Sequence, residues 1–163
     1  MAIEDPAHVV DAPTPNRLAD AVSIASDFGI AWIAIALLQV LFKRSTPLDA
    51  ARRLGIAGTV SLALTRWLKH RYAVPRGDAA SPSLARVPSS GRFPSGHTLA
   101  AFTAAITVPT RPTGRAIAVA FAALVGWARV RVGHHRAVDV LAGAGVGTLA
   151  GAVLAAVLPS GAS

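Results

Sequence analysis

The stretch Phe93-Pro94-Ser95-Gly96-His97 decides how the chain folds, because a polar loop ends there and an apolar segment begins. Pro94 fixes its own φ and disfavours helical conformation at Phe93, so Ser95 is placed to cap the helix that follows. The first N–H groups of that helix, from Gly96 onward, have no partners within it and form an anion site with the helix dipole. His97 in the first turn could donate a proton to a bound anion. Taken alone, the five residues fit an ordinary Ser cap beside a chance histidine equally well.

The composition is that of a membrane protein. Of the 163 residues, 53% are hydrophobic and only 15% are charged, and the mean hydropathy is +0.50. Soluble domains usually carry about a quarter charged residues. The chain has no Cys, which excludes disulfides and thiolate metal sites. The formal net charge is +8, but the arginines flank apolar runs and are not interleaved with aromatic residues. This pattern favours anionic lipid or phosphate over nucleic acid as a partner.

Long uncharged runs predict an all-α bundle of about five transmembrane helices. We expect one domain over residues 21–159, preceded by a mobile acidic tail at 1–20 and followed by a short tail at 160–163. Arg52 and Arg53 near the start of the second span must snorkel to the interface. Gly143, Gly147 and Gly151 recur every four residues in the last span and predict a close-packing helix face. The expected spans cover residues 22–42, 48–68, 97–109, 116–128 and 137–158.

Five spans place residues 69–97 and 129–139 together at one membrane face. The opposite face receives a different group of cations: Lys43, Arg44, Arg52, Arg53, Arg111 and Arg115. The positive-inside rule then puts the first group, and any site it forms, outside the cytoplasm. We expect an integral protein of a bacterial plasma membrane with an extracytoplasmic site.

Two further clusters carry chemistry beside Ser95 and His97. Lys69 and Arg76 lie seven residues apart after the second span, and alone they would also fit an anchor on lipid headgroups. In the other cluster His135 and Asp139 lie four residues apart, on one helix face. A carboxylate on one imidazole nitrogen leaves the other as a nucleophile.

Two alternatives stand beside these assignments. Asp139 could pair simply with Arg136 or Arg131 at a polar helix start. His97 and His135 could bind zinc, but the surrounding cations would repel a metal ion. Phosphoryl transfer fits the whole set of groups better than zinc binding, because the equatorial oxygens of the transferred phosphoryl group must be neutralised. The set comprises two histidines, the backbone N–H groups beside Ser95, and the cations Lys69, Arg76 and Arg129.

Three motifs lie in order between apolar spans: Lys-x6-Arg, Pro-Ser-Gly-His and Arg-x5-His-x3-Asp. Together they resemble the motifs of the type 2 phosphatidic acid phosphatase (PAP2) superfamily. The resemblance covers roughly residues 48–145. The family contains membrane lipid phosphatases and, more distantly, vanadium haloperoxidases. The chain departs from the family pattern at Gly77, where the first motif usually has Pro, and at Ala128, where the third usually has Ser.

The resemblance implies a role for each motif residue. His135 attacks phosphorus and forms a phosphohistidine, Asp139 orients His135, and His97 protonates the leaving oxygen and then activates water. The phosphoryl oxygens are held by Lys69, Arg76, Ser95, Gly96 and Arg129. No metal or cofactor is implied. Neighbouring His134 is the less suitable nucleophile, because His135 has the four-residue spacing to Asp139 and the family's spacing from Arg129.

The expected substrate is a phosphate or diphosphate on a lipid in the bilayer. The resemblance suggests an isoprenoid carrier first, such as polyprenyl-phosphoryl-5-phosphoribose or polyprenyl diphosphate. Phosphatidylglycerophosphate and phosphatidic acid are alternatives. A non-catalytic protein that binds anionic lipid would need the cations but not His97, His135 or Asp139. A haloperoxidase is disfavoured, because relatives of that type are soluble and larger.

Overall fold

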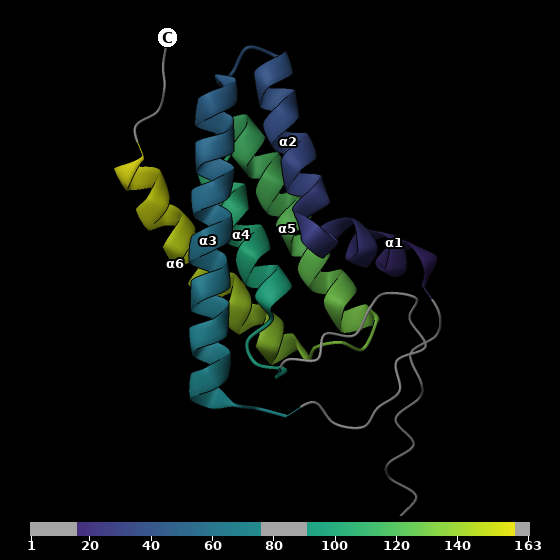
Figure 1. Cartoon of the computed structure of the whole chain (residues 1–163). Helices are drawn as coiled ribbons and strands as arrows, with labels where there is room; N and C mark the ends of the chain where they lie inside the picture. Colours follow the sequence, from purple (N-terminus) through teal and green to yellow (C-terminus); the bar gives the residue numbers. More distant parts are fainter. Residues whose placement is uncertain (1–15, 76–90, 159–163) are drawn as a thin grey trace, which may run out of the picture.

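The computed structural model describes residues 16–75 and 91–158, and this part of the chain is helical without any strand (Figure 1). The expected all-α fold is therefore confirmed. The elements in chain order are α1 (Arg17–Ser26), the short 3-10 helix η2 (Asp27–Gly29), α2 (Ile30–Leu41), α3 (Pro47–Tyr72), α4 (Gly96–Thr107), α5 (Pro112–Arg131) and α6 (Ala137–Val157).

Local sequence sets the ends of the first helices. Asn16 caps α1 by accepting the N–H of Ala19 at 3.1 Å. Thr46 caps α3 in the same way, with Pro47 at the first helical position, as the sequence predicts. Gly29 has a φ of 74°, which favours glycine, and separates α1 from α2. The two helices consequently meet at an angle of 68°.

Helix α4 lies at the centre of the bundle and packs against α3, α5 and α6 (Figure 1). The predicted glycine face of α6 makes the closest of these contacts. A Cβ on Gly143 would lie 2.6 Å from the carbonyl oxygen of Ser95, and one on Gly147 would overlap the carbonyl oxygen of Leu99. Only glycine lets the two helix backbones approach this closely, so the packing role of this face is confirmed.

Fewer helices qualify as membrane spans than the five expected. In the described residues, α5 and α6 are long and apolar enough to cross a membrane, and α1 with α2 would form a third, bent span. Helix α3 has 26 residues but carries charged side chains at both ends, and α4 has only 12 residues. A span needs about 20 predominantly apolar residues, so α4 is too short by itself. It is instead enclosed by its neighbours.

The position of Arg53 differs from the expectation that its side chain snorkels to the interface. It does not snorkel to the interface but is 3% exposed, and its Nη1 donates to the carbonyl oxygen of Thr107 at 3.1 Å. Its Nε pairs with Asp49 at 2.9 Å. A buried charge is tolerated when it is paired and hydrogen-bonded, so Arg53 ties α3 to the end of α4. Arg52, in contrast, is exposed.

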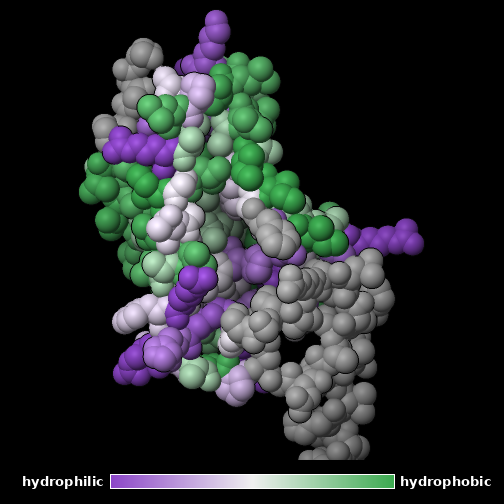
Figure 2. Space-filling model, in the orientation of Figure 1, coloured by the Kyte–Doolittle hydropathy of each residue, from purple (hydrophilic) through white to green (hydrophobic). Residues whose placement is uncertain are grey.

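The surface fits a membrane environment. Figure 2 shows hydrophobic residues over the upper part of one face and hydrophilic residues at its lower end, where α3 ends. Large exposed hydrophobic side chains lie on α2, α3 and α6, among them Leu37, Leu41, Leu62, Leu141 and Leu149. Of the predicted tails, residues 1–15 and 160–163 lie outside the described residues, whereas 17–20 belong to α1.

Candidate active site

The ends of four helices meet at the lower end of the bundle in Figure 1: α3 and α5 finish there, and α4 and α6 begin there. The rings of Tyr72 and Phe93 meet edge to face with centroids 5.5 Å apart, which joins the end of α3 to the start of α4. The N–H of Ser95 donates to the carbonyl oxygen of Asp139 at 2.9 Å, which joins α4 to α6. Segments far apart in the sequence thus form one site.

A cavity of ≈ 640 Å³ opens at this end between the α1–α2 bend, α3 and α4. Lys69, Gly96, His97 and His135 all line it, so one residue or more from each predicted motif borders the same space. The rest of its wall is mainly apolar or small: Ser26, Gly29, Trp32, Leu54, Gly58, Ser61, Leu62, Thr65, Ala100 and Ala104.

His135 and Asp139 are both buried and face each other. The imidazole Nδ1 of His135 lies 3.9 Å from Asp139 Oδ2, which is ion-pair distance but too long for a hydrogen bond. The same carboxylate oxygen accepts the backbone N–H of Arg136 at 2.8 Å and lies 3.2 Å from Arg92 Nε. The ion pair of Asp139 is therefore with Arg92, and neither of the arginines considered from the sequence supplies it.

His97 has a carboxylate partner that the sequence reasoning missed. Its Nε2 lies 2.9 Å from Oδ1 of Asp27, which is in η2 at the α1–α2 bend. An acidic residue inside a predicted span was the available signal, since such a charge needs a partner. Its partner could not be identified, because the bend that brings Asp27 to α4 is a tertiary feature.

Arg129 is fully buried. Its Nη1 donates to Oγ of Ser23 at 2.6 Å and lies 3.4 Å from Oδ1 of Asp27. The predicted phosphate ligand is thus held by α1 and η2, and Asp27 links it to His97. Arg129 is not among the residues that line the cavity.

Of the remaining predicted phosphate ligands, Gly96 and Lys69 border the cavity, whereas Ser95 does not line it. Ser95 occupies the N-cap position of α4, but its side chain makes no capping bond, which corrects the expected cap. Its buried hydroxyl instead accepts from Thr98 Oγ1 at 2.9 Å. Gly96 borders the cavity, and a Cβ there would lie 2.7 Å from Cγ2 of Thr65. Lys69 Nζ donates to the carbonyl oxygen of Gly91 at 2.7 Å. Arg76 lies outside the described residues.

His134 and His135 are distinguished by their surroundings. Both are buried, at 3% and 5% exposure, but only His135 borders the cavity. No group of three or more His, Asp or Glu side chains in the described ranges, 16–75 and 91–158, is arranged to hold a metal ion. Besides the hydroxyl side chains of Ser26, Ser61 and Thr65, the described residues bring two imidazoles, an ammonium group and the N-terminal end of α4 to the cavity.

Comparison with known proteins identifies the family and finds solved structures of similar fold. The model of the PAP2 superfamily matches residues 50–160. A similar fold occurs in the transmembrane PAP2-type phosphatidylglycerolphosphate phosphatase from Bacillus subtilis, with 22% identity, a TM-score of 0.61, and coverage of 84% of this chain and 73% of that one. Aquifex aeolicus LpxE has a similar fold too, with 20% identity, a TM-score of 0.60, and coverage of 87% of this chain and 88% of that one.

No curated protein matches in sequence. The N-terminal bend formed by α1, η2 and α2 lies outside the residues that the family model matches. Because the family model covers more than half of the chain and all three motifs, the chain belongs to the PAP2 superfamily.

Proposed function

We propose that this integral membrane protein is a metal-independent phosphatase that hydrolyses a phosphomonoester or diphosphate on a lipid carrier. One observation carries the proposal: His97, His135 and Lys69 border a single cavity whose other walls are largely apolar. A phosphate needs cations and proton donors, whereas a lipid chain needs an apolar path. The cavity offers both to one molecule.

The first chemical step uses His135. Its Nδ1 faces Asp139, which leaves Nε2 as the atom that attacks phosphorus. The new N–P bond forms as the bond from phosphorus to the lipid oxygen breaks, and the product is a phosphohistidine. Asp139 stabilises the positive charge that develops on the imidazole, and Arg92 holds that carboxylate in place.

His97 supplies and removes the protons. It donates a proton to the leaving lipid oxygen in the first step and takes one from water in the second. That water attacks phosphorus, breaks the N–P bond and releases inorganic phosphate with a neutral His135. Asp27 acts as a positioning residue, because its contact with Nε2 of His97 at 2.9 Å fixes the ring and leaves Nδ1 for the reaction.

The phosphoryl oxygens are held by Lys69, the N–H of Gly96 and the cation Arg129, with Ser95 and Arg76 completing the set. The support is strongest for Lys69 and Gly96, which border the cavity. Guanidinium and ammonium groups stabilise charge that spreads over the equatorial oxygens in the transition state.

A lipid substrate fits the shape of the wall that α3 supplies. The lining residues of this helix, from Leu54 to Lys69, lie on one face and are separated by fifteen residue steps along the helix. At a rise of 1.5 Å per residue this is a path of about 22 Å, which accommodates a long hydrocarbon chain. Trp32 and Ala104 extend the apolar wall on the facing helices.

An isoprenoid-linked phosphate, such as polyprenyl-phosphoryl-5-phosphoribose or polyprenyl diphosphate, is our first candidate substrate. Phosphatidylglycerophosphate is the second, because the Bacillus subtilis protein of similar fold is a phosphatidylglycerolphosphate phosphatase. Phosphatidic acid is a third.

The test is phosphate release by the purified protein from matched panels of these lipids, with and without EDTA. We expect release from at least one isoprenoid phosphate at an unchanged rate in EDTA. His135→Ala serves as the inactive control. Release that stops in EDTA would contradict metal independence, and equal release by the His135→Ala protein would contradict the proposed function.

We further propose that the protein lies in a bacterial plasma membrane with the site on the extracytoplasmic face. The chain contains no Cys, so single cysteines can report orientation without background. Tyr72→Cys, at the site end, should react with a membrane-impermeant maleimide in intact cells. Thr113→Cys, at the opposite end, should react only after the cells are opened. The reverse pattern would place the site in the cytoplasm.

A further inference from the structure

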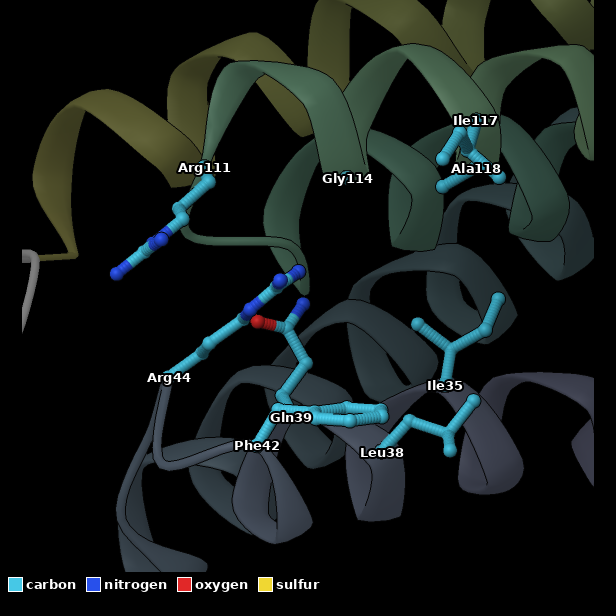
Figure 3. A pocket seen from close by; sticks show the side chains of 9 residues that line it. All are labelled: Ile35, Leu38, Gln39, Phe42, Arg44, Arg111, Gly114, Ile117 and Ala118. Atoms are coloured by element: carbon cyan, nitrogen blue, oxygen red, sulfur yellow. The ribbon is translucent and has the colours of Figure 1, made fainter.

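A second pocket lies at the end of the bundle opposite the candidate active site. It has a volume of ≈ 190 Å³ and lies between the end of α2 and the start of α5. We call it the α2–α5 groove, and Figure 3 shows all the residues that line it: Ile35, Leu38, Gln39, Phe42, Arg44, Arg111, Gly114, Ile117 and Ala118.

The groove is divided into a cationic end and an apolar end. Figure 3 shows Arg44 and Arg111 on the same side of the groove and Ile35 and Ile117 on the other side. The Arg44 guanidinium lies beside the Gln39 amide, and the Arg111 side chain extends away from it. Ile117 is 67% exposed, so the apolar end opens on the surface that faces the bilayer. A molecule that fills the groove along its length must therefore carry negative charge at one end and hydrocarbon at the other.

The two guanidinium groups are available for such a charge. Within the described ranges neither makes a hydrogen bond or an ion pair. The Arg44 guanidinium lies over the Phe42 ring, 5.6 Å from its centroid. The nearest described carboxylate along the chain, Asp49, is already paired with Arg53 at 2.9 Å. Lys43, Arg52 and Arg115 add further positive charge to this end of the bundle.

We propose that the α2–α5 groove binds an anionic phospholipid. Its phosphate lies between Arg44 and Arg111, and an acyl chain follows Leu38 and Ile117 toward the middle of the bilayer. Basic pockets between transmembrane helices recognise anionic headgroups through charge-assisted hydrogen bonds. Gln39 is buried, and its Oε1 lies 3.3 Å from Oγ1 of Thr110, so it provides a polar group where the headgroup meets the acyl chain. This site is separate from the cavity that holds His97 and His135.

Native mass spectrometry of the delipidated protein tests the proposal. The full chain in detergent is titrated with phosphatidylglycerol, with phosphatidylcholine of the same acyl chains, and with inorganic phosphate alone. We expect phosphatidylglycerol to bind most tightly, and we expect any binding of free phosphate, which the candidate active site could also hold, to be the same in the unmodified protein and in the double variant. The double variant Arg44→Gln/Arg111→Gln should weaken phosphatidylglycerol binding about tenfold or more and bring it near that of phosphatidylcholine.

The matched control is Arg52→Gln/Arg66→Gln, which removes the same charge from two exposed arginines outside the groove. It should keep the preference for phosphatidylglycerol. An equal loss in the control would mean that bulk charge, and not the groove, attracts the lipid, and would overturn the proposal. Equal binding of the two lipids by the unmodified protein would do the same. A lipid-free dimer that excludes phosphatidylglycerol would assign the groove to a second copy of the chain instead.

Discussion

Replacing Asp27 by Asn tests whether the α1–α2 bend takes part in catalysis. The change keeps the shape of the side chain but removes the charge that faces Nε2 of His97 at 2.9 Å and Nη1 of Arg129 at 3.4 Å. If Asp27 positions His97 for proton transfer, the chemical step must slow while the fold survives.

The size of the effect follows from the contact. A hydrogen bond to a charged group contributes about 1.5–3 kcal/mol. The side chains of Asp27 and His97 are 18% and 28% exposed, so solvent weakens the pair, and Asn can still contact the ring. We therefore expect a loss of about 1–2 kcal/mol in transition-state stabilisation, which is roughly a fivefold to thirtyfold fall in kcat. The whole general acid contributes about 10²–10⁴-fold, so the Asn variant should remain more active than His97→Ala.

The assay is steady-state phosphate release by the purified variants, with kcat and KM determined separately. We expect kcat to fall with little change in KM, and Asp27→Glu to recover part of the loss. Asp49→Asn is the control, because Asp49 also pairs with a cation at 2.9 Å but lies at the opposite end of the bundle. An unchanged kcat would refute the positioning role. A lower KM with unchanged kcat would instead mean that Asp27 occupies the phosphate site until substrate displaces it.

Three further outcomes are expected. His135→Ala should abolish phosphate release while His134→Ala keeps much of it, because only His135 borders the cavity; the opposite result would reject the assignment of the nucleophile. A substrate with a labelled phosphate should transfer its label to the active protein in a form that acid removes and base does not, and the His135→Ala protein should carry no label. Label on another residue would exclude a phosphohistidine at His135. Gly147→Ala should lower stability by about 1–3 kcal/mol because its Cβ overlaps the backbone of α4, as measured by thermal unfolding in detergent. Gly145→Ala has open space and should not lower it, and equal losses would remove the packing explanation.

The parts of the fold that follow local rules could be predicted from the sequence. Thr46 with Pro47 marks a helix start through capping and ring geometry, and the structure has α3 begin there. The glycines of α6 indicate a close helix contact because their spacing puts them on one face. These features need only residues within a few turns of one another.

The number of spans could not be predicted in this way. Hydropathy treats each run as an independent helix in lipid, but Arg53 shows that a charge near the start of α3 is neutralised by contacts with Asp49 and the carbonyl of Thr107. Helix α4 is short, but α3, α5 and α6 surround it, and a helix that meets protein need not match the bilayer.

The same limit applies to the candidate site. The spacing of His135 and Asp139 predicts that they share a helix face, but His135 lies in the turn before α6 and only Asp139 belongs to the helix. The two side chains still come within 3.9 Å of each other. No spacing rule connects Asp139 to Arg92, or Asp27 to His97, because loops and the bend at Gly29 bring these pairs together. The roles of the motif residues in catalysis stay predictions until the variants are assayed.

The N-terminal bend belongs to the site and is more than a membrane anchor. The family match begins at residue 50, yet Ser23 and Asp27 hold Arg129 and His97, and Trp32 lines the same cavity. Residues of the bend line one side of the cavity, so a substrate chain that follows α3 as proposed would pass beside it. A change in the bend should therefore alter the rate through Asp27 and the choice of lipid through Trp32. Trp32→Ala is expected to change the relative rates for long and short lipid phosphates while the motif residues remain in place, and an unchanged ratio would separate the bend from substrate selection.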